Sequence, residues 1–270
     1  MNNNRIYIFL LIIFTFVLLS YLLSLTGNVV QVERKEGIVM RVIDGDTIEI
    51  NISGKIEKIR LLDVNTPETK EFYHDEAFDF LNRTIAGKVV YMEGEERDRY
   101  GRILGYVFYN ENFINEQILE NGYGHYFSYQ DTGYTDEMKK AEEYAKENFS
   151  GIWQKSSDAC SDCITIKDFD SGKGKDDCKA GMEFAIFYNK CDNACDLNRW
   201  SVKDSATHTY KFENVVIYNG KSIILSNGIG KDNETSLFWG NKGCASLWND
   251  KGDALFLRDS DGKLVLYYEY

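Results

Sequence analysis

The sequence predicts a multidomain chain with a transmembrane helix, an α+β barrel domain and an all-β sandwich. Three observations support this fold class. An uncharged apolar run lies near the N-terminus, five strand patterns with interspersed helical patterns follow, and short strand patterns separated by Asn, Gly and Asp turns fill the rest. A chain of 270 residues fits two domains of about 100 to 150 residues each. A hydrophobic content of 43% argues against a disordered chain.

The apolar run, residues 6 to 25, is long enough to cross the bilayer core as one helix, which takes about 20 residues. Arg5 precedes the run, and no clear small-x-small cleavage pattern follows it. This favours an uncleaved anchor with its N-terminus inside over a removed signal peptide. We therefore expect a membrane-anchored protein on the extracellular face, or a secreted one if the helix is cleaved.

A barrel is expected between residues 37 and 155. The apolar and β-branched residues predict five strands, at 37–43, 47–52, 56–62, 88–92 and 103–109. Apolar residues at helical spacing predict three helices, at 71–86, 113–120 and 136–148. Five strands with interspersed helices are typical of a closed β-barrel of the OB type.

The texture changes after a linker at residues 156 to 163. From residue 164 to residue 270 no helical stripe is convincing, and strands are expected at 183–188, 200–203, 209–212, 222–225 and 254–257. An all-β sandwich is the simplest interpretation.

The cysteines are confined to this C-terminal region: Cys160, Cys163, Cys178, Cys191, Cys195 and Cys244. Export makes disulfides the expected state of these six residues, although the sequence does not select the pairing. Cys160-x-x-Cys163 taken alone could begin a zinc ribbon or form a redox pair. A second C-x-x-C motif is missing, which favours disulfides.

Three polar motifs occur in the barrel region. They are Val42-Ile-Asp-Gly-Asp-Thr47, Arg60-Leu-Leu-Asp-Val-Asn-Thr-Pro-Glu-Thr69 and Asp98-Arg-Tyr-Gly-Arg102. Carboxylates and Asn hold a hard cation through oxygen, and guanidinium groups can clamp a phosphate. Each motif also has a purely structural explanation, as a turn, an ion pair or a strand-face charge. Their joint order, with the single proline Pro67 in the longest motif, favours metal-assisted phosphodiester cleavage.

The three motifs resemble, in order and spacing, the signature blocks of the staphylococcal nuclease (thermonuclease) family, over residues 37 to 153. The resemblance implies a calcium ion held by the Asp46 carboxylate, the Asn65 side chain and the Thr66 backbone carbonyl, with Asp44 supporting them. Family members release 3′-phosphate ends from DNA and RNA.

The same resemblance implies the roles of the remaining motif residues. Glu68 would orient or deprotonate the attacking water, and Arg60 and Arg102 would hold phosphate oxygens in the transition state. Tyr100 would stack on a base of the substrate. Tyr126, Tyr129 and Tyr134 each fit either a stacking role or packing of the loop before the last helix.

Two departures from the family pattern bear on activity. Asn65 stands where the family commonly has Asp, so a charged calcium ligand becomes neutral and weaker binding is expected. The loop between Glu68 and the first helix is also shorter, which leaves substrate preference open.

The C-terminal half resembles a lamin tail domain, an immunoglobulin-like sandwich. The resemblance rests on Glu183-Phe-Ala-Ile-Phe-Tyr-Asn189, Asp196-Leu-x-x-Trp200-Ser-Val-Lys-Asp204, Leu225-Ser-Asn-Gly228 and Trp248-Asn-x-x-Gly-Asp253. It covers about residues 164 to 270 and implies binding or placement rather than chemistry, for example of a cell-surface ligand.

A net charge of −12 is unfavourable for tight nucleic-acid binding. The sequence still favours a monomeric, calcium-dependent nuclease that acts on DNA or RNA. The main alternative is a catalytically inactive, surface-tethered interaction protein that has lost calcium through Asn65 and binds with its sandwich. A third interpretation, a module that captures nucleic acid without cutting it, is disfavoured by the acidic balance.

Overall fold

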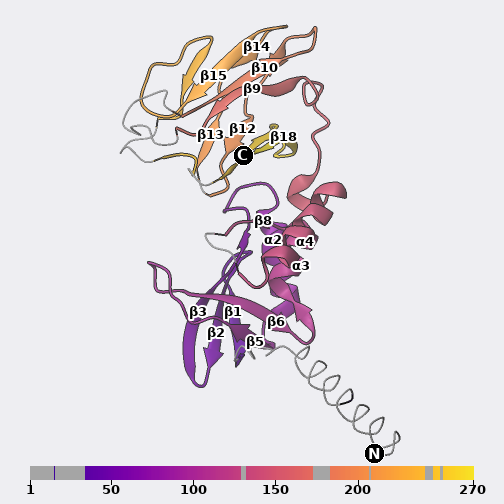
Figure 1. Ribbon diagram of the computed structural model, residues 1–270, viewed down its shortest axis with the longest axis vertical. Helices are drawn as coiled ribbons and strands as arrows, with labels where there is room; N and C mark the ends of the chain where they lie inside the picture. Colours follow the sequence, from indigo (N-terminus) through magenta and orange to yellow (C-terminus); the bar gives the residue numbers. More distant parts are fainter. Residues whose placement is uncertain are drawn as a thin grey trace, which may run out of the picture. The chain divides into compact units, whose positions relative to one another are not determined.

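The computed structural model describes Thr15 and residues 34–128, 132–172, 183–206, 208–240, 246–249 and 252–270. The chain divides into two units, Met1–Arg34 and Lys35–Tyr270. All the strands and helices discussed below belong to the second unit and are drawn in Figure 1.

The expected transmembrane helix is the part of the predicted fold class that is wrong. Among the described residues, no helix combines the length and the apolar character that spanning a bilayer requires. The longest described helices have 13 and 12 residues and carry charges along one face. Apart from Thr15, residues 6 to 25 lie outside the described part of the chain. The corrected fold class is a five-stranded barrel followed by a β-rich C-terminal region.

The barrel is a sheet that closes on itself. Its five strands, in sheet order, are β3 (Lys55–Leu61), β2 (Thr47–Ile52), β1 (Lys35–Val42), β5 (Val89–Glu93) and β6 (Ile103–Tyr109); the short β7 (Asn112–Phe113) pairs with β6. Parallel pairing of β3 with β6, from Ile59 opposite Ile103 to Leu61 opposite Gly105, closes the barrel. Alternate residues of each strand point inward, so Ile48, Ile50 and Ile59 are fully buried in its core.

Three amphipathic helices cover the barrel core. They are α2 (His74–Ile85), α3 (Ile114–Glu120) and α4 (Thr135–Glu147). The first begins three residues later than its apolar pattern predicts, because Tyr73 adopts a left-handed conformation with φ 72°. Its Leu81 and Ile85 pack into the same core as Ile118 and Leu119 of α3.

A two-stranded ladder holds the loop that carries the second motif. β4 (Val64–Asn65) pairs antiparallel with β8 (His125–Tyr126), which follows α3. Just before β4, the Asp63 carboxylate accepts a hydrogen bond from the buried Tyr106 hydroxyl at 2.5 Å. The backbone that presents Asn65 and Thr66 is therefore fixed from two sides.

The C-terminal region is a sandwich of two four-stranded sheets. One sheet contains β16 (Ser236–Phe238), β15 (Ser222–Ser226), β10 (Phe184–Asn189) and β9 (Ile164–Asp170), in that order. The other contains β13 (Thr209–Lys211), β12 (Ser201–Lys203), β17 (Ala254–Arg258) and β18 (Leu264–Glu269). A short pair, β11 (Cys195–Asp196) with β14 (Val216–Ile217), lies beside them. The inner faces share one core that includes Phe187, Trp200, Phe212 and Trp248.

Two disulfides confirm the cysteine prediction for four of the six residues. Cys160 bonds to Cys195, and Cys163 bonds to Cys191, so the two cysteines of the C-x-x-C motif have different partners. The other two candidates, Cys178 and Cys244, lie outside the described residues.

Barrel and sandwich share a third, smaller core. The short helix η1 (Gly151–Trp153) follows α4, and its Ile152 and Trp153 pack against Phe256 of β17 together with Leu264 and Tyr267 of β18. The connecting chain adds backbone hydrogen bonds, from Leu264 N to Gln154 O and from Ser156 N to Leu264 O, each 2.8 Å. The sandwich is therefore docked on the barrel through buried contacts.

Candidate active site

Asp46 is the centre of the candidate site. This buried carboxylate lies in the turn between β1 and β2, where its Oδ2 accepts hydrogen bonds from the Thr66 N–H and the Thr66 hydroxyl, each 3.0 Å. The turn packs so closely on the Thr66 loop that a Cβ at Gly45 would lie 2.6 Å from Thr66 Oγ1. Glycine at position 45 is what allows the first and second motifs to meet.

Arg60 contacts both the Asp46 carboxylate and the Asn65 amide. It lies in β3 opposite Thr47, and its Nε lies 3.0 Å from Asp46 Oδ1. Its Nη2 donates to Asn65 Oδ1 at 3.1 Å, and its Nη1 donates to the Val64 carbonyl at 2.7 Å. Because one guanidinium contacts both, Asp46 Oδ1 and Asn65 Oδ1 converge on one small region.

Asp44 lies in the same β1–β2 turn as Asp46. Its Oδ1 accepts a hydrogen bond from the Asp46 N–H at 3.1 Å. Burial raises the pKa of the Asp44 carboxyl above its usual value, and the negative charge of Asp46 raises it further. A cation bound here would relieve this repulsion.

The donor set fits a hard divalent cation such as calcium. The predicted ligands Asp46, Asn65 and Thr66 offer carboxylate, amide and carbonyl oxygens, which calcium prefers over nitrogen or sulfur. Within the described residues, His, Cys, Asp and Glu form no cluster of three that could hold a metal, so the site depends on amide and backbone oxygens. Arg60 now contacts the two converging oxygens and would have to release them on metal binding.

Glu68 lies in the loop between β4 and α2, close to this group in sequence but exposed. Its backbone N–H is fixed by Glu71 Oε2 at 2.8 Å, whereas its own carboxylate makes no hydrogen bond or ion pair with any described residue. A carboxylate placed in this way can accept a proton from water.

Arg102 and Tyr100 form a separate arrangement at the start of β6. Asp98 Oδ2 accepts from Arg102 Nε at 2.7 Å, and Asp98 Oδ1 accepts from the N–H groups of Tyr100 and Arg102, each 2.9 Å. Burial alone would raise the pKa of the Asp98 carboxyl, but the hydrogen bonds and charge of Arg102 hold it below its usual value. Tyr100 is 69% exposed, with the guanidinium carbons of Arg99 and Arg102 at 4.8 and 5.5 Å from its ring centre. Arg102 comes directly before β6, in which Leu104 pairs with Arg60 of β3.

Of the other three tyrosines, Tyr129 lies outside the described residues, and the remaining two differ in exposure and contacts. Tyr134 packs against Tyr106 and Phe113 of the barrel core, and Tyr126 lies half-buried beneath Lys139. For Tyr134 this favours the packing role over stacking on a substrate.

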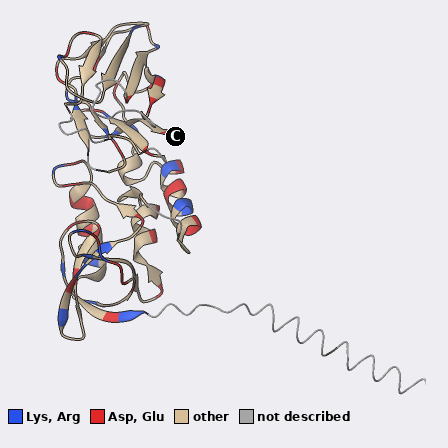
Figure 2. Cartoon of the chain, turned by 60° about the vertical axis from the view of Figure 1, so that its left-hand side comes forward, with Lys and Arg blue, Asp and Glu red and all other residues tan. Residues whose placement is uncertain are grey.

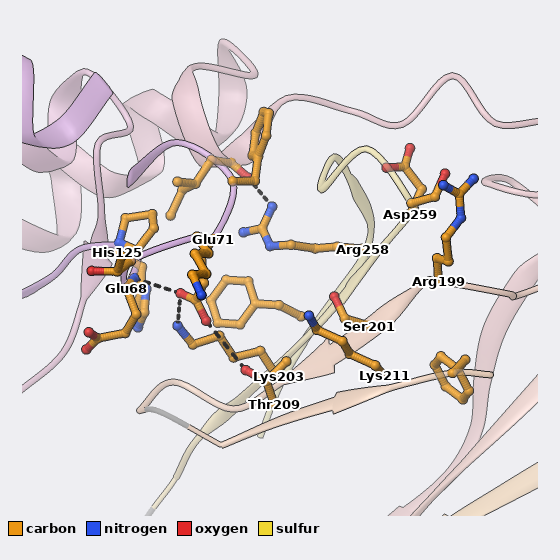
Figure 3. A pocket seen from close by; sticks show the side chains of 18 of the residues that line it. Glu68, Glu71, His125, Arg199, Ser201, Lys203, Thr209, Lys211, Arg258 and Asp259 are labelled. Atoms are coloured by element: carbon orange, nitrogen blue, oxygen red, sulfur yellow. Dashed lines mark hydrogen bonds and ion pairs between the residues drawn. The ribbon is translucent and has the colours of Figure 1, made fainter. Parts of the chain in front are cut away.

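A cleft of about 630 Å³ opens beside Glu68, between the β4–α2 loop and the sandwich (Figure 3). The barrel side is the run from Thr66 to Phe72, and the sandwich side carries basic residues from β12, β13 and β17. The basic lining residues are Lys70, Arg199, Lys203, Lys211 and Arg258. Of these, Lys203 is paired with Glu71 at 2.5 Å, and Arg258 donates to the Ile152 carbonyl at 2.7 Å.

Sequence patterns gave no sign of two residues next to the site. His125 is buried in β8, and Ser205 lies just after β12; the Ser205 carbonyl accepts from His125 Nε2 at 2.8 Å and from Asn65 Nδ2 at 3.0 Å. Because a carbonyl can only accept, His125 carries its proton on Nε2.

Comparison with known proteins matches both parts of the chain. A family model of staphylococcal nuclease homologues matches residues 58–155, and a lamin tail domain model matches residues 129–270. A thermonuclease of Staphylococcus hyicus is 35% identical over 124 residues, which cover 43% of this chain and 73% of that protein.

Two further relatives match the same part of the chain. An uncharacterised protein of Bacillus anthracis is 39% identical over 132 residues, which cover 45% of this chain and 62% of that protein. A prophage-derived endonuclease of Bacillus subtilis is 32% identical over 126 residues, which cover 43% of each chain. The chain thus spans less than two thirds of the length of these two relatives.

The barrel and the motif residues that it brings together define a domain of the nuclease class. The chain belongs to the staphylococcal nuclease family and carries a lamin tail domain after its barrel. Both resemblances drawn from the motifs are confirmed.

Proposed function

We propose that this protein is a calcium-dependent nuclease that hydrolyses phosphodiester bonds of DNA or RNA and leaves 3′-phosphate ends. The observation that supports this best is the convergence of Asp46 Oδ1 and Asn65 Oδ1 on one guanidinium, next to the loop that carries Glu68. The names of the relatives support the nuclease part of this proposal.

Calcium bound by Asp46, Asn65 and Thr66 would polarise the scissile phosphate and offset its growing charge. Arg60 would then move from its present contacts with the two oxygens to the phosphate, and Arg102 would hold a second phosphate oxygen. Glu68 takes a proton from the attacking water while the oxygen of that water bonds to phosphorus. The bond from phosphorus to the 5′-oxygen breaks, that oxygen takes up a proton, and the phosphate stays on the 3′ side.

Substrate contacts in this proposal are local, since the chain as a whole is acidic. Figure 2 shows basic and acidic residues interspersed, for example along α4. Tyr100 is exposed enough to stack on a base, and Lys70 and Lys211 line the cleft beside Glu68 without an ion pair to any described residue. Binding is therefore expected to be modest, and its fall with salt should be shallow, because few phosphates are neutralised.

We also propose that the protein acts outside the cytoplasm. Both disulfides have partners fixed within the sandwich core, and such bonds persist in oxidising compartments. Degradation of extracellular nucleic acid is the role that fits this location.

One observation favours the alternative of an inactive binding protein. Arg60 already neutralises Asp46 and contacts Asn65, so the neutral Asn65 could leave too little negative charge to displace it. In that case the sandwich would be the working part, with a cell-surface ligand as its partner.

Cleavage of single-stranded DNA by the oxidised protein across a calcium titration, with EDTA as the blank, tests the proposal. We expect calcium-dependent products with 3′-phosphate ends that are lost in Glu68→Gln and Arg102→Ala. The matched controls are Glu76→Gln and Arg83→Ala on α2, which change exposed charges that contact none of the site residues named above. A folded protein that shows no cleavage at high calcium would support the inactive alternative.

A further inference from the structure

Both polar atoms of the Asn65 side chain form hydrogen bonds, and the amide nitrogen Nδ2 donates to the sandwich. Asn65 Nδ2 donates to the Ser205 carbonyl at 3.0 Å and to the Ala206 carbonyl at 3.3 Å. Its Oδ1 faces Arg60, on the side of Asp46. Two carbonyls can only accept, so the orientation of the amide follows from the contacts.

A carboxylate would not fit at this position. An aspartate at 65 would present a negatively charged oxygen to the buried Ser205 carbonyl and the part-buried Ala206 carbonyl, with no proton between them. Such an unpaired, buried arrangement is strongly unfavourable. The neutral residue that departs from the family pattern is therefore the one that the docked sandwich requires.

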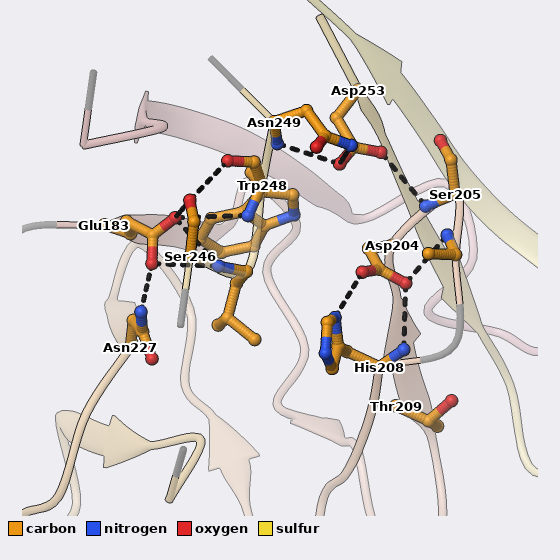
Figure 4. Close-up of polar contacts among 12 residues, drawn as sticks. Glu183, Asp204, Ser205, His208, Thr209, Asn227, Ser246, Trp248, Asn249 and Asp253 are labelled. Atoms are coloured by element: carbon orange, nitrogen blue, oxygen red, sulfur yellow. Dashed lines mark hydrogen bonds and ion pairs between the residues drawn. The ribbon is translucent and has the colours of Figure 1, made fainter. Parts of the chain in front are cut away.

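The turn that receives Asn65 is held from within the sandwich (Figure 4). Ser205 N donates to Asp253 Oδ1 at 3.1 Å, and the Ser205 hydroxyl accepts from the Ala254 N–H at 3.0 Å. Asp204 Oδ1 accepts from the Ala206 N–H at 3.0 Å. Asp204, Ser205 and Asp253 are all buried, so the two carbonyls have little freedom to move.

Further contacts keep the turn against the barrel. Lys203, two residues before Ser205, pairs with Glu71 of the β4–α2 loop. The His125 ring lies 5.0 Å from that of Phe256, and His125 donates to the same Ser205 carbonyl as Asn65. The docking of the sandwich therefore does not depend on Asn65 alone.

We propose that the Ser205–Ala206 turn of the lamin tail domain positions a calcium ligand of the nuclease site. By holding Nδ2, the turn fixes Asn65 Oδ1 toward Asp46 and offsets part of the affinity that a neutral ligand loses. Asp253 is then a positioning residue, which acts through Ser205 although it belongs to the other domain. This inference rests on the proposed calcium-dependent function.

The test measures calcium affinity by calorimetry, without substrate, on the full chain. Residues that orient metal ligands typically change affinity by tenfold or more, and we expect Asp253→Ala to weaken calcium binding about tenfold. Glu183→Gln is the matched control, since Glu183 is another buried carboxylate of the sandwich that accepts backbone N–H groups, from Leu247 and Trp248, away from the turn. The calcium affinity of Glu183→Gln is expected to stay within about twofold of wild type, well below the tenfold loss expected for Asp253→Ala.

Asn65→Asp provides the second arm. We expect it to destabilise the fold and not to tighten calcium binding, and we expect Asp253→Ala to have no further effect in this background. If Asp253→Ala fails to fold, Ser205→Ala, which removes one of the two acceptors of the Ala254 N–H, takes its place.

Three results would overturn the inference while leaving the function intact. They are unchanged calcium affinity in Asp253→Ala, an equal loss in Glu183→Gln, or tighter calcium binding by a fully stable Asn65→Asp. If the wild-type chain binds no calcium at all, the proposed function itself fails, and this inference fails with it.

Discussion

Replacing His125 with glutamine is expected to remove a pH dependence from the stability of this protein. Burial lowers the pKa of His125 to about 3, against the opposing effect of the Ser205 carbonyl, and the charges of Lys203, Arg258 and Lys146 lower it further. In an unfolded chain the pKa of histidine is about 6.5. Between these two values the unfolded chain binds a proton that the folded chain does not. Stability must therefore fall as the pH falls below about 6.5.

The size of the effect follows from the two pKa values. Each pH unit in this window costs about 1.36 kcal/mol, so His125 removes about 2 kcal/mol from the free energy of unfolding at pH 5. Glutamine is neutral at every pH, and its amide can still donate to the Ser205 carbonyl.

Urea unfolding of wild type and His125→Gln at pH 7.5 and pH 5 measures this difference directly. Other titrating groups are common to both proteins and cancel in the comparison. We expect the variant to gain about 2 kcal/mol on wild type between pH 7.5 and pH 5. A difference between the two proteins that is the same at both pH values would refute the assignment of a buried, neutral His125.

Three further predictions concern the sandwich and its docking. Replacing Cys160 and Cys195 with serine should lower the free energy of unfolding in urea by about 2 kcal/mol, since the intact Cys163–Cys191 bond nested inside this loop leaves only about seven further residues to be constrained; equal stability would show that the bond does not constrain the unfolded chain. A double-mutant cycle of Glu71→Gln and Lys203→Met, measured by thermal unfolding, should give a coupling of about 1 kcal/mol, and a coupling of zero would contradict the docked geometry. Glu183→Gln should destabilise the sandwich by about 1 to 3 kcal/mol, since Oε1 of Glu183 accepts from Leu247 N–H and Oε2 from Asn227 Nδ2, and glutamine keeps only one acceptor oxygen; an unchanged melting temperature would be inconsistent with these contacts.

Local periodicity was enough to predict most of the barrel. All five long strands and all three helices occur close to their expected positions, because the alternation of strands and the stripe of helices are properties of neighbouring residues. The start of α2 was missed by three residues, since the left-handed Tyr73 interrupts a pattern that otherwise continues. In the sandwich, β9 and β18 were not expected, because their apolar residues do not alternate cleanly with polar ones.

The contacts among the motif residues of the candidate site were predictable from the sequence. Asp46, Arg60, Asn65 and Thr66 are in contact, as expected from motifs that meet across one barrel end. The contact of Asn65 with the backbone of Ser205, 140 residues away, could not be predicted, since a carbonyl acceptor leaves no mark in the sequence. The catalytic and ligand roles of these residues, and the domain boundary at residues 156 to 163, stay predictions.

The shared core around Trp153 has a consequence for how this protein can be divided. Trp153 is almost completely buried, and part of its cover comes from Phe256 and Tyr267, more than 100 residues further along the chain. A barrel expressed without the sandwich would expose this indole and present an adhesive apolar surface. The barrel and the sandwich are therefore not independent domains that can be exchanged or expressed separately. The fluorescence of Trp153 should report whether they have separated.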